Sequence, residues 1–293
     1  MADFELIRAG FLDVVERFGE WTNHNVCLGE DLYTIGKEKI TGAEVKLRRI
    51  VQMVADISGK SFEELRILDL ACLEGLYGLE LALQGAEVVG IEGREANVEK
   101  ARFVKEVLGV ENITFFQDDV RNLSREKYGS FDVVLCIGIF YHLDAPDVFR
   151  FMESIGEVCR GFAIVDTHVS LTAESCCTYG DKEYWGRFYK EHDPESSLED
   201  RMKVLWSSLD NVNSFWLSRP SFYNLLGDAG FTSVYECHFP AVEKYEKMRF
   251  KKENDRSTFV AIKGEPVRFL SSPKMGDLGS KSCQEFNQLI QDS

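Results

Sequence analysis

An acidic residue and a glycine-bearing turn stand at a spacing that suits the binding of a nucleoside. The short apolar run RILDLA begins at Arg66, and a turn that extends to Gly78 follows it. Glu92 ends the next apolar run, 21 residues after Ala71. In an open parallel sheet, ligands bind at the carboxyl ends of the strands, and an acid at about this spacing accepts the hydroxyls of a ribose. The pattern indicates a nucleoside-containing ligand held by Glu92, the alternative being a solvated strand-end residue.

A second acidic pair follows the third apolar run, NITFFQ (112–117). The carboxylate of Asp119 can accept a hydrogen bond from an adenine amino group while the N–H of Val120 faces a ring nitrogen. Asp118 is a rival for the same contact. We therefore expect the adenine of the ligand at this strand end.

Three of the five histidines, His24, His142 and His168, fall in segments that we expect to border the ligand. Histidine titrates near neutral pH and serves as a general base. His142, just after the run FDVVLCIG (131–138), is the first candidate base. His168 lies two residues beyond Asp166, so strand alternation places both on one face and allows an Asp–His pair. Each histidine can equally be a hydrogen-bonded structural residue.

The hydrophobic pattern predicts a scaffold for these residues. Strand-like runs alternate with helical patterns, as in parallel βαβ units. The expected strands are 66–71, 87–92, 112–117, 131–138 and 161–170, and the expected helices are 76–84, 95–108, one after Pro146 and one near 221–229. Two last runs, 231–239 and 257–264, flank a charged stretch without a crossover-helix pattern and should pair antiparallel. We predict an α/β, Rossmann-like seven-stranded sheet, mostly parallel with an antiparallel last strand and helices on both faces.

Three segments flank or interrupt the predicted core, residues 61–264. Residues 1–60 are helical at both ends and form an N-terminal lid segment, while the aromatic-rich interruption at 170–219 is interpreted as a cap over a pocket. The tail, 265–293, is peripheral, with a possible short helix near 284–290. Pockets for small molecules combine apolar walls with a few polar groups. Ordinary packing also explains each of the candidate substrate contacts. These are His24, Tyr141, Trp185, Arg187, Tyr189 and Trp216.

Composition and charge limit the classes of partner. The chain is 44% hydrophobic and 28% charged, as in folded globular proteins. Its net charge of −15 repels phosphate backbones, which argues against nucleic acid as a partner. The longest uncharged apolar run, Val133 to Tyr141, is about half of the roughly twenty residues that cross a bilayer. The first twenty residues lack the basic-then-apolar layout of a secretion signal, so we predict a cytoplasmic protein without membrane spans.

The eight cysteines do not predict a metal site or a disulfide framework. They are scattered through the chain, and the adjacent pair Cys176 and Cys177 lacks the two-to-four-residue spacing of zinc ligands. We therefore expect reduced thiols and no metal.

In this order, the motifs resemble those of the class I S-adenosylmethionine-dependent methyltransferases over about residues 60 to 264. In that superfamily the first strand carries D-x-G-x-G-x-G, an acid ends the second strand, another follows the third, and the seventh strand is antiparallel. The run IGIFYHLDAP, with WTNHNVCLGEDLYTIG ahead of the core, resembles a subgroup of tRNA uridine carboxymethyl transferases and small-molecule methyltransferases. Ala71 and Leu73 replace the first two glycines of the motif and Gly75 keeps the third, so the turn is bulkier than usual.

The resemblance implies S-adenosylmethionine as cofactor and methyl transfer to an oxygen or nitrogen of a small polar metabolite. Asp69 would orient the turn and the ammonium group of the cofactor, and the carbonyls at the end of the fourth strand would lie beside the sulfonium. A general base, His142 or the pair Asp166 and His168, is needed only where the acceptor must lose a proton. The residues that the resemblance places around the cofactor, besides Glu92, Asp118, Asp119 and Val120, are Asp69, Ala71, Cys72, Leu73, Gly75, Ile137 and Gly138.

Three alternatives stay open at this point. A tRNA-modifying (carboxymethyl or methyl) transferase fits the IGIFYHL run, but the net charge opposes a long phosphate footprint. A non-catalytic binding protein would result if Ala71 and Leu73 closed the cofactor cleft. A dehydrogenase shares the acid after the second strand but would need G-x-G-x-x-G, which is absent.

Overall fold

A computed structural model describes residues 2–39, 42–237, 255–267 and 270–271. The chain divides into two units, residues 1–263 and 264–293. In the second unit, the described residues form no helix or strand. The helix that we expect near 284–290, and most of the charged stretch between the last two strands, lie outside the described residues.

A seven-stranded sheet forms the centre of the first unit, with the strand order β11-β12-β7-β6-β3-β4-β5. β3 to β7 run parallel to one another, whereas β12 pairs antiparallel with both β7 and β11. The sheet topology and the antiparallel pairing of the last two strands are therefore confirmed. The strands are β3 (Arg66–Leu70), β4 (Glu87–Glu92), β5 (Ile113–Gln117), β6 (Phe131–Ile137), β7 (Cys159–His168), β11 (Ser233–Glu236) and β12 (Arg256–Ile262).

Alternating apolar side chains bury both faces of this sheet, because successive residues of a strand point to opposite sides. In β3, Leu68 and Leu70 belong to the core on one face, whereas Ile67 belongs to the core on the other. In β6, Val134 and Leu135 divide in the same way. The central strands are apolar at nearly every position because both of their faces are covered.

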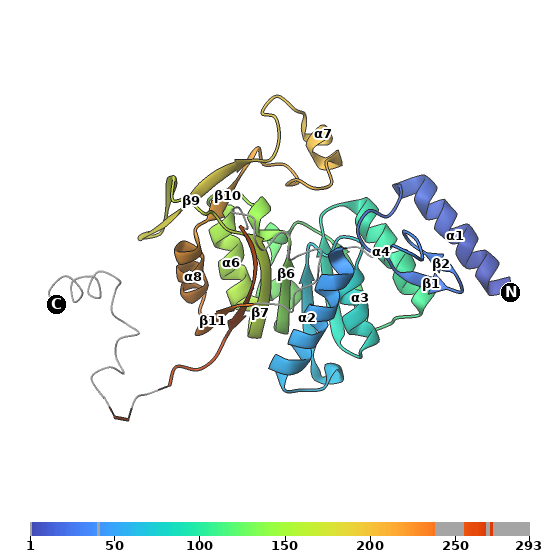
Figure 1. Ribbon diagram of the computed structural model, residues 1–293, viewed down its shortest axis with the longest axis horizontal. Coiled ribbons are helices and arrows are strands. Elements are labelled where there is room, and N and C mark those ends of the chain that lie inside the picture. Colours follow the sequence, from blue (N-terminus) through green and yellow to red (C-terminus); the bar gives the residue numbers. More distant parts are fainter. Residues whose placement is uncertain (1, 40–41, 238–254, 268–269, 272–293) are drawn as a thin grey trace. The chain divides into compact units, whose positions relative to one another are not determined.

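Helices cover the two faces, and Figure 1 shows α2 and α3 on one side of the sheet, with α6 and α8 packed near β6 and β7. α2, α3 and α4 pack on one core, where α1 lies against α4. α5, α6 and α8 pack on the other. The helices are α1 (Ala2–Phe18), α2 (Gly42–Ser58), α3 (Leu76–Leu83), α4 (Glu95–Leu108), α5 (Arg125–Tyr128), α6 (Asp147–Val158) and α8 (Arg219–Asp228).

The aromatic-rich interruption folds as a separate antiparallel sheet with the order β10-β9-β8. Its strands are β8 (Ser175–Tyr179), β9 (Lys182–Lys190) and β10 (Asn213–Leu217), and α7 (Leu198–Lys203) lies between β9 and β10 in sequence. β9, β10 and α7 lie above the main sheet in the view of Figure 1. We call this insertion, residues 170–219, the cap.

The remaining short elements connect these layers. A small antiparallel pair, β1 (Cys27–Gly29) and β2 (Leu32–Tyr33), separates α1 from α2. Short 3₁₀ helices are η1 (Phe62–Glu64), η2 (Val120–Asn122) and η3 (Phe140–His142). η2 and η3 directly follow the expected ligand-binding ends of β5 and β6.

The strand order reverses between β3 and β6, since the chain builds β4 and β5 on one side of β3 and then returns to its other side. Ligands bind at such a reversal, outside the carboxyl ends of the strands. The turn after β3 and the turn after β6 therefore face the same opening.

Candidate functional site

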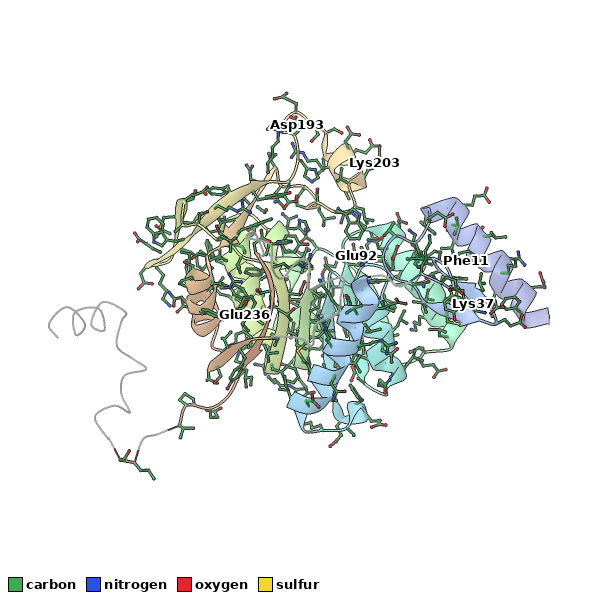
Figure 2. The ribbon with its side chains drawn as sticks, viewed as in Figure 1. Phe11, Lys37, Glu92, Asp193, Lys203 and Glu236 are labelled. Atoms are coloured by element: carbon green, nitrogen blue, oxygen red, sulfur yellow. The ribbon has the colours of Figure 1, made fainter. Side chains whose placement is uncertain are left out.

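A cavity of about 380 Å³ lies at the carboxyl ends of β3, β4 and β6. In Figure 2, Glu92 lies at the upper part of the main body, on the side of α7. The walls of the cavity come from the N-terminal segment, the core and the cap. The lining residues are Asn23, His24, Gly42, Ala43, Lys46, Asp69, Ala71, Cys72, Leu73, Tyr77, Glu92, Arg94, Ile137, Gly138, Ile139, Tyr141, His142, Leu205, Trp206, Ser207 and Arg256.

The turn after β3 keeps a glycine-type conformation although two of its residues are not glycine. Ala71 and Leu73 each have φ of 51°, in the left-handed region that favours glycine. At Gly75 (φ 85°), a Cβ would come within 2.9 Å of side-chain atoms of Ala101 and Phe115. Glycine is therefore required at that position, whereas the two bulkier residues are tolerated at theirs. Leu73 lines the cavity, so it narrows the opening without closing it.

Two buried carboxyl groups stand at the base of the cavity. Asp69 accepts a hydrogen bond from the backbone N–H of Gly78 at 3.0 Å, and burial raises its pKa to about 7. Glu92 accepts from the backbone N–H groups of Leu73 at 3.0 Å and Arg94 at 2.9 Å. Burial raises the pKa of Glu92, while the Arg94 backbone and charge oppose that rise. Both residues lie where the sequence places them.

The N-terminal segment reaches the cavity through a carboxylate on the turn. Glu74, whose side chain is fully buried, accepts from the backbone N–H groups of Thr22 at 2.8 Å and His24 at 2.9 Å. The ring Nδ1 of His24 accepts from the N–H of Leu76 at 3.1 Å, so the ring proton is on Nε2. Burial lowers the pKa of His24 to about 3, which keeps the ring neutral. His24 thus lines the cavity as a neutral donor.

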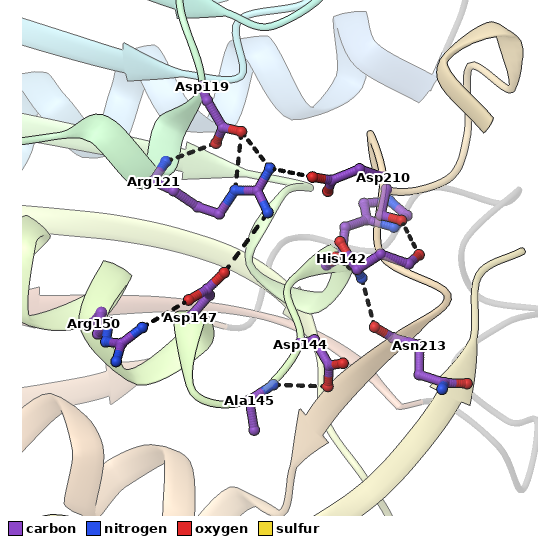
Figure 3. Close-up of polar contacts among 11 residues, drawn as sticks. Asp119, Arg121, His142, Asp144, Ala145, Asp147, Arg150, Asp210 and Asn213 are labelled. Atoms are coloured by element: carbon purple, nitrogen blue, oxygen red, sulfur yellow. Dashed lines mark hydrogen bonds and ion pairs between the residues drawn. The ribbon is translucent and has the colours of Figure 1, made fainter. Parts of the chain in front are cut away.

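The acids after β5 differ from the prediction, because they make other contacts and do not line this cavity. Asp118 accepts from Lys127 and Tyr128, and although burial opposes it these contacts lower its pKa to about 2. Asp119 pairs with Arg121, which also contacts Asp210 of the cap (Figure 3). Both carboxylates meet local cations that the sequence pattern did not associate with them. Val120 is buried beside them.

His142 lies at the cavity wall in η3, directly after β6, as predicted. Its Nδ1 is 3.0 Å from both carboxylate oxygens of Glu191. Tyr141, also at the wall, packs its ring 4.2 Å from the His142 ring. Ile137 and Gly138 line the same end of the cavity.

The predicted pair of Asp166 with His168 does not form. His168 Nδ1 is 2.7 Å from Asp255 instead, and its ring stacks on Trp216. Asp166 Oδ1 binds Lys46 Nζ and Arg256 Nε, each at 2.7 Å. Burial opposes ionisation, but the two cations lower the pKa of Asp166 to about 2. Neither Asp166 nor His168 lines the cavity. Arg256 of β12 and Lys46 of α2 bind Asp166, whereas Asp255, the residue before β12, binds His168.

Four predicted cap contacts also lie away from the cavity wall. Trp185 is 44% exposed and Tyr189 43% exposed. Trp216 is buried by stacking against Tyr189 and by a hydrogen bond from its Nε1 to the carbonyl of Tyr141, and Arg187 packs over its ring. These residues hold the cap together. The cap segment at the wall is Leu205 to Ser207, which follows α7.

Sequence reasoning missed four charged residues of the site. Lys46 comes from α2, Arg94 follows β4, and Arg256 begins β12. Glu191 reaches His142 from the end of β9. Helical periodicity predicted α2, but no local pattern marks Lys46, because its partner Asp166 lies 120 residues away in sequence.

Within the described part of the chain, we find no support for a metal site, a disulfide or a membrane-spanning helix. No group of three or more metal-binding side chains is found among the described residues. The cysteines that the structure describes are free thiols. Where helices are described, none is both long and apolar enough to cross a bilayer.

Comparison with known proteins finds similarity to methyltransferases in the core. Residues 61–193 match a family model described as a methyltransferase domain. A ubiquinone biosynthesis O-methyltransferase of Acinetobacter baumannii is 30% identical over 125 residues, 43% of this chain and 48% of that protein. A 23S rRNA (uracil(1939)-C(5))-methyltransferase of Shewanella halifaxensis is 39% identical over 95 residues, 32% of this chain and 21% of that protein. The chain therefore matches half or less of the length of these curated relatives.

Solved structures show the same fold. The N-terminal domain of EvdMO1, determined in the presence of SAH and D-fucose, has a TM-score of 0.63 and 24% identity, with 90% of this chain and 97% of that one covered. Magnesium protoporphyrin IX methyltransferase of Synechocystis, with bound SAM, has a TM-score of 0.50 and 16% identity, with 78% and 87% covered. Together with the topology of the sheet, these similarities show that residues 61–193 match a methyltransferase domain and that the chain shares the fold of solved methyltransferase structures.

Proposed function

We propose that this protein transfers the methyl group of S-adenosylmethionine to an oxygen or nitrogen of a small polar metabolite. The observation that carries the proposal is the cavity that joins Asp69, the turn and Glu92 to the end of β6. A buried carboxylate at the end of β4 suits ribose hydroxyls, because it accepts two hydrogen bonds in a fixed orientation. The two solved neighbours are described with SAH or SAM, the product and substrate forms of this cofactor.

The residues of the cavity fit the cofactor. Ala71 and Leu73 adopt the glycine-type backbone that brings the turn close to a ligand, and Asp69 offers a carboxyl group near it. Ile137 and Gly138 line the cavity at the end of β6, where backbone carbonyls would stabilise a positive sulfonium. When bound, the cofactor supplies an electrophilic methyl group. The protein's contribution is to align the acceptor and exclude water, which is worth up to roughly 7–11 kcal/mol in well-oriented systems.

The assignment of a small acceptor rests on the enclosure of the site. The N-terminal segment contributes Asn23 and His24, and the cap contributes Trp206 and Ser207, so the cavity is walled on sides that the sheet leaves open. The O-methyltransferase among the relatives supports oxygen as the acceptor atom. His142 is the proposed base where the acceptor has a proton to lose.

Calorimetry with S-adenosylhomocysteine and S-adenosylmethionine tests the cofactor. We expect binding by the wild type and at least a tenfold weaker affinity in Glu92→Ala, about the cost of one lost charge-assisted hydrogen bond. Glu87→Ala is the matched control, because Glu87 lies at the other end of β4 and pairs with Arg66 at the surface. No binding by the wild type, or full binding by Glu92→Ala, would contradict the proposal and favour a non-catalytic binding protein.

A second candidate is a tRNA-modifying transferase that moves a carboxymethyl group. The observation in its favour is the pair of cations at the acceptor end of the cavity, Lys46 and Arg256, which share the single carboxylate of Asp166. One positive charge is left over, and Arg256 lies close to Gly138, where the transferred group would stand. A carboxylate on the transferred carbon would neutralise that charge.

Donor preference separates the two candidates. A sulfonium donor that carries a carboxylate on its transferred carbon should bind more tightly than S-adenosylmethionine only for the second candidate, and Lys46→Met should remove that preference. Radiolabel transfer to tRNA, compared with transfer to low-molecular-weight metabolites, gives the acceptor directly. Equal affinity for the two donors would leave the small-metabolite methyltransferase as the assignment.

A further inference from the structure

A buried carboxylate holds one ring nitrogen of the candidate base. Glu191 lies just beyond β9, and its side chain is only 1% exposed. Both of its carboxylate oxygens are 3.0 Å from His142 Nδ1. His142 belongs to the core and Glu191 to the cap, so this contact joins the two parts at the wall of the cavity.

Glu191 is itself fixed from two further directions. Its Oε2 accepts from the backbone N–H of Ser208 at 3.0 Å, and its Oε1 accepts from the hydroxyl of Ser214 at 2.8 Å. Its own backbone N–H donates to the carbonyl of Val212 at 2.8 Å. A carboxylate held by these donors has little freedom to rotate away from the imidazole.

These contacts decide the tautomer of His142. An ionised carboxylate only accepts hydrogen bonds, so the proton of the neutral ring must be on Nδ1. Nε2 then carries a lone pair, and no residue that the structure describes forms a hydrogen bond with it. Because His142 lines the cavity, Nε2 is the ring nitrogen available to a ligand.

We propose that Glu191 is a positioning residue that presents His142 Nε2 to the acceptor, and that the acceptor is therefore a hydroxyl group. This inference rests on the proposed methyl transfer and deepens it. A neutral amine or a thioether attacks through a free lone pair, whereas a hydroxyl must lose a proton as its oxygen forms the new bond. A histidine base held in one tautomer can take up that proton, so it suits a hydroxyl acceptor.

The step balances without a further reactant. The oxygen of the acceptor forms a bond to the methyl carbon while the S–CH₃ bond breaks, and the electron pair of that bond stays on sulfur. The hydroxyl proton passes to Nε2 of His142. The positive charge thus moves from sulfur to the imidazole, where the carboxylate of Glu191, 3.0 Å from Nδ1, stabilises it.

The other histidine–carboxylate pair of this region is the matched control. Asp255 binds His168 Nδ1 at 2.7 Å in the same way, but His168 does not line the cavity. The variants to compare are Glu191→Gln, Glu191→Asp and Asp255→Asn, with His142→Gln to assign the resonance. Calorimetry with S-adenosylhomocysteine checks that each variant is folded and binds.

Two readouts test the proposal. Nitrogen-15 NMR of histidine-labelled protein should show His142 as the Nδ1–H tautomer in the wild type and in Asp255→Asn, with a changed tautomer population in Glu191→Gln. Transfer of labelled methyl to a low-molecular-weight cell extract should fall about 10²-fold in kcat in Glu191→Gln, with KM for S-adenosylmethionine unchanged. Glu191→Asp should recover part of the loss, because a carboxylate is restored near Nδ1.

Either of two results would overturn the proposal: an Nε2–H tautomer in the wild type, or wild-type turnover by Glu191→Gln. A labelled product that carries the methyl on nitrogen or sulfur would overturn the hydroxyl assignment. If the wild type does not bind the cofactor at all, the proposed function fails, whereas the tautomer measurement still decides the role of Glu191.

Discussion

At the scale of the residue, the turn after β3 shows that a glycine-type conformation does not require glycine at each position. The left-handed region costs an ordinary residue about 1–2 kcal/mol, and both Ala71 and Leu73 occupy it. The N–H of Cys72 donates to the carbonyl of Ile91, and the N–H of Leu73 donates to the Glu92 carboxylate, each at 3.0 Å. These bonds tie the turn to the end of β4 and offset the strain.

The raised pKa of Asp69 predicts that the stability of the folded protein depends on pH. Its pKa is about 7 in the folded protein and near 3.8 when unfolded, so the folded state holds the proton more tightly. The resulting stability is present below about pH 4 and is lost as pH rises to about 7, by up to about 4 kcal/mol. Urea unfolding of cofactor-free protein at pH 4, 6 and 8 should show this loss in the wild type and a smaller one in Asp69→Asn.

Asp118, whose pKa is shifted in the opposite direction, is the control for that experiment. The pKa of Asp118 is lowered to about 2 by its partners Lys127 and Tyr128, against the effect of burial. Asp118→Asn should therefore lose stability relative to the wild type above about pH 4. Parallel pH curves for the wild type and Asp69→Asn would show that Asp69 does not hold a proton in the folded state.

At the scale of the element, a buried carboxylate joins the N-terminal segment to the turn before α3. Glu74 accepts from Thr22, Asn23 and His24, and Lys100 lies 3.8 Å away. These bonds satisfy backbone donors that would otherwise be buried without partners. They also set Asn23 and His24 against the cavity.

Removal of that carboxylate should loosen the segment. Glu74→Ala leaves three backbone N–H groups without their acceptor and removes the carboxylate beside Lys100, which still donates to the carbonyl of Glu20. Breaking a buried pair costs about 3–5 kcal/mol. We expect this loss in urea unfolding, together with weaker S-adenosylhomocysteine binding in calorimetry. Glu80→Ala, at an exposed site of α3, should stay within about 0.5 kcal/mol. Equal stability of the two variants would show that Glu74 does not anchor the segment.

At the scale of the whole first unit, arginines of the core hold the cap beside the cavity. Arg94 donates to the carbonyls of Met202 at 3.2 Å, Val204 at 2.8 Å and Ser207 at 3.0 Å. Arg121 contacts Asp210 of the cap at 2.7 Å (Figure 3). Since Glu92 accepts from the backbone N–H of Arg94, one residue, Arg94, connects the proposed ribose-binding carboxylate with the cap.

Arg94→Met should therefore free the cap segment without unfolding the core. We expect faster hydrogen–deuterium exchange in residues 202–207, because their carbonyls lose three donors, and a faster dissociation of S-adenosylhomocysteine. Arg17→Met, at an exposed ion pair of α1, is the control. Unchanged exchange in the cap of Arg94→Met would mean that other contacts hold this segment.

The sequence by itself determined the features that depend on local periodicity and spacing. The alternation of β3 to β7 with helices, the antiparallel β12 and the positions of Asp69, Glu92 and His142 could all be predicted, because strand ends and turns follow from neighbouring residues. The predicted sheet matches the structure because its strands and turns depend on residues that are close together in the sequence.

Only the tertiary structure decided which side chains meet across long sequence distances. Asp166 was expected to pair with His168, two residues away, but Lys46 and Arg256 bind it from 120 and 90 residues away. Glu191 reaches His142 because the cap folds back on η3, a contact that no spacing in the sequence encodes. A partner for a charged group is chosen by distance and burial in the folded chain, and those quantities exist only once the layers have packed.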